Sequence, residues 1–183
     1  LVVFAMMFGM GEVVVIYPRY FTGVLGYGLG ELAAAMAAAS LSFAFLQPLM
    51  GRFADKYDKV KLTILGLILF TAATTFLILS RSSFEVYGAM LLFGVAGSLT
   101  FPAASSILAL ISPRGREGAY SGFYNMVLSL GVTISPIVVG ALADVGGYVA
   151  GFASTPVLTI IAVSAFLTAF RRSGVAEPSS QPQ

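Results

Sequence analysis

The chain has 183 residues, of which 58% are hydrophobic and 10% charged, whereas roughly 25% of the residues in a soluble globular domain are charged. This composition excludes an ordinary water-soluble enzyme, and the mean hydropathy of +0.94 indicates helices that are apolar on all sides. The absence of cysteine and histidine excludes disulfides, thiolate nucleophiles, haem ligation and histidine-based zinc sites. The net charge of +2 gives no indication of nucleic-acid binding.

The apolar segments predict an all-α membrane protein with six transmembrane helices, since roughly 20 apolar residues cross the bilayer as a helix. The first span covers residues 1–18 and ends where Pro18 and Arg19 interrupt it. The other five are charge-free runs at 32–51, 62–80, 86–113, 118–143 and 145–170. The chain begins inside an apolar run and without methionine, so we expect a fragment whose natural amino terminus lies upstream.

The basic residues alternate between the two sides of the membrane. Eight lie on one side, in the second-to-third and fourth-to-fifth connections and after the last span: Arg52, Lys56, Lys59, Lys61, Arg114, Arg116, Arg171 and Arg172. The other side carries Arg19 and Arg81. The positive-inside rule then predicts that both ends of the bundle are cytoplasmic, in the inner membrane of a cell. Residues 173–183 are rich in Pro, Ser and Gln and predict a disordered cytoplasmic tail.

The connection at residues 51–61 carries the most specific motif in the chain. It resembles the signature loop of the major facilitator superfamily, which has the pattern G-x-x-x-D-[RK]-x-G-[RK]-x-[RK] between the second and third helices of a six-helix half. The matching residues are Gly51, Asp55, Lys56, Lys59 and Lys61. Asp58 stands where the family has glycine. The resemblance implies a six-helix half of a major facilitator fold and a gating role for this connection; without it, the string is a positively charged loop with one incidental aspartate.

A second resemblance to the same superfamily lies in the fifth span. Its residues follow the glycine and proline motif of the fifth helix in the antiporter branch, with Ser135 in place of one glycine and Val139 in place of another. The residues concerned are Gly122, Gly131, Ser135, Pro136 and Gly140. Small residues allow close helix packing, and a proline can kink the helix and shape a gate. The pattern therefore predicts either a helix crossing or a role in coupling.

The fourth span favours the carboxy-terminal half of such a transporter. In amino-terminal halves of the antiporters an arginine precedes the glycine-rich stretch by four residues, whereas Met90 precedes Gly94 here. The short tail ending at Gln183 favours the same half. The string at 17–20 and the glycine and proline motif also suit an amino-terminal half, so both assignments stay open, with the carboxy-terminal half preferred.

Glu12 is the main candidate for function, because an ionised carboxylate at membrane depth is costly unless it faces a cavity or a partner. A carboxyl group that meets dry and wet surroundings in turn can bind and release a proton. Alternatively, Glu12 lies near the outer interface and pairs with Arg19, which is two helical turns away on the same face.

Other polar residues supply further candidates. Tyr124 and Asn125, with Gln47 and Tyr120, could line a cavity or bond to the carbonyl groups of neighbouring helices.

A short basic connection supplies candidates for an inner gate. Arg114 and Arg116 lie on the same predicted side as Asp55 and could pair with it to hold the gate shut.

These features predict secondary active transport of a small solute by alternating access, with proton-coupled export favoured by the motif in the fifth span. The expected partners are the solute, a proton, the bilayer, and either a missing second half or a second copy of the chain. We expect no cofactor, no metal and no nucleic acid. The main alternative is a membrane scaffold or assembly protein without transport. A channel is a further alternative, but neither it nor the scaffold explains the loop motif. An enzyme is the weakest alternative, because the chain has no His, no Cys and no opposed carboxylate pair with motif support.

Overall fold

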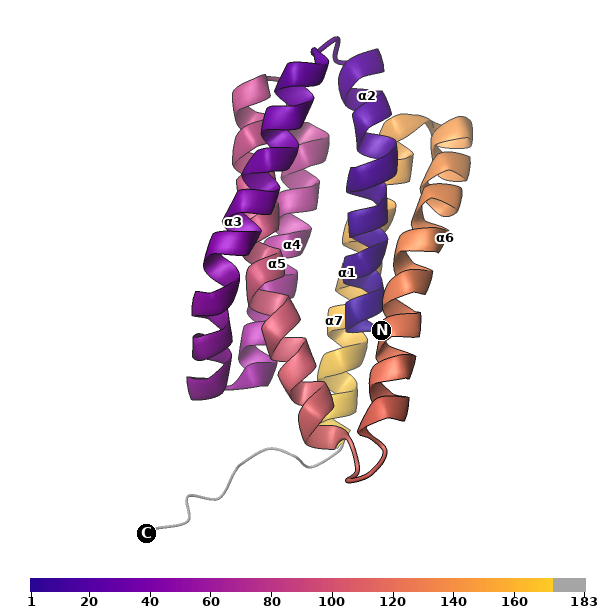
Figure 1. The fold of residues 1–183 in the computed structure, drawn as a ribbon. Coiled ribbons are helices and arrows are strands. Elements are labelled where there is room, and N and C mark those ends of the chain that lie inside the picture. The colour runs from indigo at the N-terminus through magenta and orange to yellow at the C-terminus, as the bar shows by residue number, and fades with distance from the viewer. Residues whose placement is uncertain (173–183) are drawn as a thin grey trace.

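The computed structural model describes residues 1–172, with side chains described through residue 168. Its helices run back and forth in alternating directions (Figure 1). The first span is one continuous helix made of α1 (Val2–Gly11), the π-helix η1 (Glu12–Ile16) and α2 (Tyr17–Gly23). The others are α3 (Leu29–Lys56), α4 (Lys59–Leu79), α5 (Ser83–Ile111), α6 (Glu117–Phe152) and α7 (Ser154–Arg172).

The predicted all-α fold of six helices is confirmed for residues 1–172. Five of these helices are long and apolar enough to cross a bilayer, and the side-chain-resolved part of α7, Ser154–Thr168, is a shorter apolar helix. Successive connections lie at opposite ends of the bundle, so the connections α3 to α4 and α5 to α6 share one end (Figure 1). The tail predicted at 173–183 lies outside the described residues.

The first span is longer than expected, because its helix continues past Pro18 to Gly23. A proline usually interrupts a helix, since it lacks an N–H and its ring collides with the carbonyl four residues earlier. Here the preceding turn is the π-helix η1, in which the N–H of Tyr17 bonds to the carbonyl of Glu12. This wider turn makes room for the proline ring, and the helix passes through it.

The boundary between the last two spans also differs from the expected one. We placed it at Asp144, but α6 continues to Phe152 across a kink at Gly147, where φ is +79°. A charged residue at the end of a span can extend to water without ending the helix. A left-handed backbone conformation does interrupt it, and glycine adopts that conformation at little cost. The glycine, and not the charge, therefore marks the corner.

The helices pack in two groups. α3 and α4 pack along α5, whereas α1 packs along α6 and α7. Glycine permits the closest approaches: Gly94 of α5 lies against the backbone of Ala39 in α3, and Gly66 of α4 lies against Thr100 in α5. Because a side chain at either glycine would collide with its neighbour, these contacts hold the helix axes close together.

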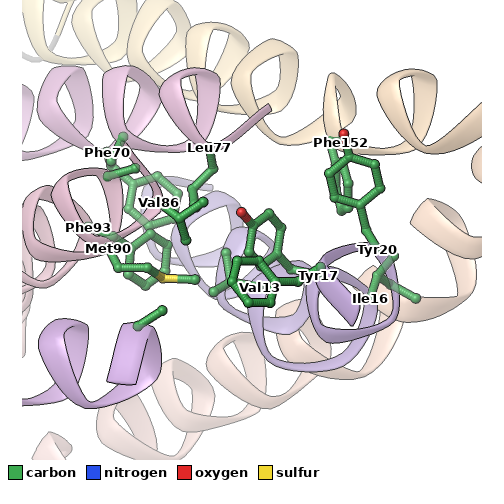
Figure 2. Close-up of a cluster of buried hydrophobic side chains, with 14 of the residues drawn as sticks. Val13, Ile16, Tyr17, Tyr20, Phe70, Leu77, Val86, Met90, Phe93 and Phe152 are labelled. Atoms are coloured by element: carbon green, nitrogen blue, oxygen red, sulfur yellow. The ribbon is translucent and has the colours of Figure 1, made fainter. Parts of the chain in front are cut away.

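Buried side chains of both groups form one hydrophobic cluster (Figure 2), and aromatic rings lie in contact within each group. The rings of Phe70 in α4 and Phe93 in α5 lie 5.0 Å apart, and those of Tyr20 in α2 and Phe152 in α6 lie 5.3 Å apart. Met90 is fully buried in the same cluster. Large rings bury much apolar area, so the cluster fixes the first span relative to its neighbours.

Candidate functional site: an apolar pocket and a buried carboxylate

A pocket of about 380 Å³ lies between α1, η1, α3, α4 and α5. Its walls are mainly methionine and phenylalanine side chains with small residues between them. The lining consists of Met6, Met7, Met10, Val13, Val14, Met36, Ala39, Ser40, Phe43, Phe70, Phe93, Gly94, Gly97 and Phe101. A volume of this order suits a small organic molecule.

Small residues keep this pocket open. A Cβ atom built on Gly97 would lie 3.1 Å from the ring of Phe43, so a larger side chain would enter the space. The hydroxyl of Ser42 donates to the carbonyl of Ala39 (3.0 Å) and to that of Leu91 (3.2 Å). The second bond connects α3 to α5 beside the pocket. A hydrogen bond between the two helices therefore supports this wall in addition to the lining side chains.

The pocket lining has a simple chemistry. It contains no Asp, Glu, Lys or Arg, and Ser40 is its one polar side chain. Methionine is flexible and polarisable and makes favourable contacts with aromatic rings. The walls contributed by residues 1–172 can therefore hold an apolar, ring-containing part of a molecule, and they offer no partner for an ionic group.

Glu12 does not line this pocket. It is only 3% exposed and lies on the opposite side of the first span, where its carboxylate accepts a hydrogen bond from the hydroxyl of Thr155 in α7. Gly9, one turn earlier, makes room for this arrangement: a Cβ built there would lie 2.7 Å from the Thr155 methyl group. The ring of Phe70 in α4 also packs against Gly9. The carboxylate is thus held between helices of its own bundle.

The alternative that Glu12 pairs with Arg19 does not hold in this structure. Glu12 is buried, Arg19 is exposed, and the described residues contain no ion pair between them. The expectation assumed regular α-helix, in which residues seven apart lie on one face. The π-helix changes the register between the two, so the two side chains leave the helix on different sides.

The polar candidates of α6 are not brought to the apolar pocket. Tyr124 lines a separate cavity of about 450 Å³ near the start of α1, and its hydroxyl lies 3.4 Å from that of Ser105. Asn125 is exposed and donates to the carbonyl of Ser121 (2.9 Å). A role of Tyr124 and Asn125 in solute binding therefore stays a prediction.

The motif at 51–61 forms a helix end and not a long loop. Gly51, Asp55 and Lys56 belong to the last turns of α3, while Lys59 and Lys61 belong to the first turn of α4. Asp58 is the N-cap of α4: its carboxylate accepts from the N–H groups of Val60 (2.8 Å) and Lys61 (3.3 Å). The residue that departs from the family pattern therefore stabilises the turn itself.

Two further placements concern this end of the bundle. A Cβ at Gly51 would meet nothing within 4 Å among the described residues. Within that same part of the chain, no ion pair joins Arg114 or Arg116 to Asp55, and both arginines are exposed in the connection from α5 to α6. The inner gate stays a prediction for another conformation.

Some residues of the glycine and proline motif of α6 pack closely against α1, and others have open space around them. A Cβ at Gly131 would lie 2.7 Å from that of Met7 and 2.8 Å from the carbonyl oxygen of Phe4, and Ser135 packs against Gly11. These two positions let α6 approach α1. The others differ, since Gly122 and Gly140 have open space around them and Pro136 is half-buried inside α6.

Sequence reasoning missed two features of this region. Thr155 is one of many hydroxyl residues in apolar helices, and nothing in its local sequence connects it to Glu12, 143 positions away. The methionines of the pocket did carry a signal, because Met6 and Met10 are one helical turn apart. That spacing alone does not distinguish a pocket wall from ordinary packing.

Comparison with known proteins identifies similar sequences. Residues 1–183 match the Major Facilitator Superfamily. The quinolone resistance protein NorA of Staphylococcus aureus is 27% identical over 145 residues, which cover 78% of this chain and 37% of NorA. Multidrug resistance protein 2 of Bacillus subtilis (strain 168) is 28% identical over 152 residues, covering 82% of this chain and 36% of the relative.

Solved structures share the fold. The POT family transporter PepTSo superposes with a TM-score of 0.77 at 16% identity, covering 100% of this chain and 38% of PepTSo. A peptide transporter POT in complex with sulfate gives a TM-score of 0.76 at 20% identity, covering 93% of this chain and 36% of the transporter. The chain thus spans well under half the length of the proteins it resembles.

Proposed function

Because the chain belongs to the major facilitator superfamily, we propose that it is one six-helix half of a secondary active transporter that exports small, largely apolar solutes in exchange for protons. Membership of this family places it among membrane transporters and not among enzymes. Alternating access would expose a site between two halves first to one side of the membrane and then to the other.

The observation that carries this proposal is the methionine and phenylalanine pocket between α1, α3, α4 and α5. An uncharged pocket favours apolar solutes over sugars, anions or peptides, because polar groups buried without partners are costly. The names of the similar proteins, a quinolone resistance protein and a multidrug resistance protein, support the same class of solute.

The finer assignments are part of the proposal. Met90 is fully buried where amino-terminal halves of the antiporters carry arginine, which supports the carboxy-terminal half. The opposite wall of the pocket would come from the other half of a longer chain, or from a second copy of this one. The concentration of basic residues at one end supports a cytoplasmic position for that end, in the inner membrane.

Glu12 is the group that we assign to proton coupling. Its burial at membrane depth, together with the hydroxyl bond from Thr155, supports a carboxyl group that is held dry in this conformation. Its position opposite the pocket supports a coupling route separate from the solute: the proton would act on the packing of the first span against α7.

The test uses the full-length protein in everted membrane vesicles from cells that lack their own multidrug pumps. A fluorescent quinolone should accumulate in the vesicles when their lumen is acidic, and a protonophore should abolish the accumulation. Gly97→Leu, which fills the pocket, should reduce accumulation about tenfold. Gly88→Leu is the matched control on α5, because a Cβ there meets nothing closer than 3.9 Å.

Two results would count against the proposal. Well-folded protein that gives no accumulation above that of empty vesicles for a panel of apolar dyes and quinolones would favour the scaffold alternative. Accumulation that persists unchanged in Gly97→Leu would place the solute outside this pocket.

A further inference from the structure

One polar side chain interrupts the apolar lining of the pocket between α1, η1, α3, α4 and α5. The hydroxyl of Ser40 in α3 donates to the carbonyl of Met36 at 2.9 Å, the usual bond of a helical serine to the residue four positions earlier. A hydroxyl group has one proton and two lone pairs. Because this proton is bound to the backbone, the Ser40 oxygen can accept a hydrogen bond from a molecule in the pocket but cannot donate one.

Ser40 lies at the open rim of the pocket. Its neighbours on the same face of α3 are Met36 and Phe43, which also line the pocket. The deepest lining side chains are almost fully buried, with Phe70 1% and Met6 3% exposed, whereas Ser40 is exposed. A ring that fills the pocket would therefore contact methionine and phenylalanine in its depth and the serine oxygen at its rim.

No other side chain among the described lining residues competes strongly for a hydrogen-bond donor. The rest of the lining is Met, Phe, Val, Ala and Gly, and a thioether sulfur accepts only weakly. The carbonyl of Ala39 already accepts from the hydroxyl of Ser42 at 3.0 Å and lies against Gly94. Other carbonyl groups of the walls accept the bonds of their own helices. A donor on a bound molecule therefore has Ser40 as its strongest side-chain partner in this lining.

We propose that Ser40 selects, among apolar solutes, those that carry an uncharged N–H or O–H donor beside a ring system. The ring fills the methionine and phenylalanine walls, and the donor bonds to the Ser40 oxygen at the rim. The donor is uncharged because the lining holds no carboxylate to balance a positive charge. A donor that entered the pocket without an acceptor would lose its bonds to water at a cost. This proposal rests on the proposed function, since it names the solute class of the same pocket.

Two fluorescent coumarins that differ in one donor test the assignment. One carries a methylamino group with a single N–H, and its dimethylamino analogue has a methyl group in place of that proton. Fluorescence polarisation of each dye, titrated with the purified full-length protein in detergent, gives the two dissociation constants without a proton gradient. Their ratio is compared between variants, so that the difference in hydrophobicity between the dyes cancels.

The variants separate the hydroxyl from the rest of the serine. Ser40→Ala removes the acceptor and should weaken binding of the N–H dye about three- to tenfold, while the dimethylamino dye binds as before. Ser40→Thr keeps a hydroxyl that can bond to the same carbonyl, so it should retain the wild-type ratio. Ser164→Ala is the matched control: Ser164 is also exposed and donates to the carbonyl four residues earlier at 2.9 Å, but it lies on α7 outside the pocket. It should bind both dyes as the wild type does.

Three results would overturn the proposal. The first is a wild-type protein that binds neither dye, and the second is an unchanged ratio of dissociation constants in Ser40→Ala. The third is unchanged binding of both dyes in Gly97→Leu, which fills the pocket, because the dyes would then bind elsewhere.

The vesicle assay keeps this proposal distinct from the proposed function. If the ratio depends on Ser40 but no solute accumulates in vesicles, the Ser40 site stands and the transport proposal is wrong. If solutes accumulate but the ratio does not depend on Ser40, transport stands and the Ser40 assignment is wrong.

Discussion

The two sides of the first spanning helix differ in chemistry although they share one stretch of sequence. One side contributes Met6, Met7 and Met10 to an open apolar pocket. The other side holds Glu12, a buried carboxylate that accepts a hydrogen bond from Thr155 of α7. Under the proposed function, the pocket side of this helix would face the solute and the Glu12 side would carry the proton, with the helix itself as the connection between them.

The largest expected effect comes from removing the charge on the buried side. Glu12→Gln keeps the shape and the bond from Thr155 but cannot release a proton, so gradient-driven accumulation should fall at least about tenfold. Counterflow exchange of labelled quinolone without a gradient should persist, because the pocket is intact. Asp144→Asn, an exposed carboxylate of α6, is the control and should behave as the wild type. Equal loss of exchange and accumulation in Glu12→Gln would show that the two sides are not separate.

The partner of Glu12 on α7 gives the next effect. Thr155 donates to the charged carboxylate, so its loss in Thr155→Val disfavours the charged form, and the midpoint of the pH profile should move up by about one unit. Thr159→Val is the control: Thr159 is also buried, and among the described residues its hydroxyl bonds to the carbonyl of Thr155 alone (2.8 Å). A downward shift in Thr155→Val would contradict the assignment.

The packing of α6 against α1 should contribute to the stability of the protein. Gly131→Leu places a side chain against Met7 and the carbonyl of Phe4, so we expect a loss of about 1–3 kcal/mol in the free energy of unfolding. Gly122→Leu, on the same helix but with open space around it, should cost far less. Thermal unfolding of the full-length protein in detergent measures both. Equal midpoints for the two variants would mean that α6 does not approach α1 as described.

We expect the smallest effect at the start of α4, which is distant from both sides of the first span. Asp58→Ala removes the cap that accepts from Val60 and Lys61, and should cost about 1 kcal/mol in stability. Asp55→Ala, also exposed, removes a carboxylate that makes no hydrogen bond or ion pair with the side chains described, those of residues 1–168, and should be neutral for stability. The same thermal measurement checks this pair, and a larger loss in Asp55→Ala would reassign the structural role to the motif aspartate.

Much of the fold could be predicted because it depends on local properties. Runs of apolar residues long enough to cross a bilayer predict helices whatever their partners are, and six such runs predicted the confirmed architecture. The ends were less predictable. Pro18 was expected to stop a helix that the π-turn carries through, and Asp144 was expected to mark a corner that Gly147 makes.

The candidate site, like the fold, could be predicted from the sequence only in part. A carboxylate at Glu12 stands out in an apolar run, so the sequence alone identified it as a residue that needs a partner. Which partner it has depends on the angle at which distant helices cross, and this joined it to Thr155 and not to Arg19. Likewise, methionines one turn apart can be found by inspection, but they became a pocket wall only because Gly94 and Gly97 bring α5 close to α3 while leaving space beside it.

The sequence by itself determined that this protein spans a membrane as helices, that its basic residues concentrate at one end, and that one acidic group lies at membrane depth, because hydrophobicity and charge act along the chain. Only the tertiary structure decided which side of each helix faces which neighbour. That assignment depends on backbone register, which a single π-turn at Glu12–Ile16 changes, and on side-chain contacts between residues far apart in the chain.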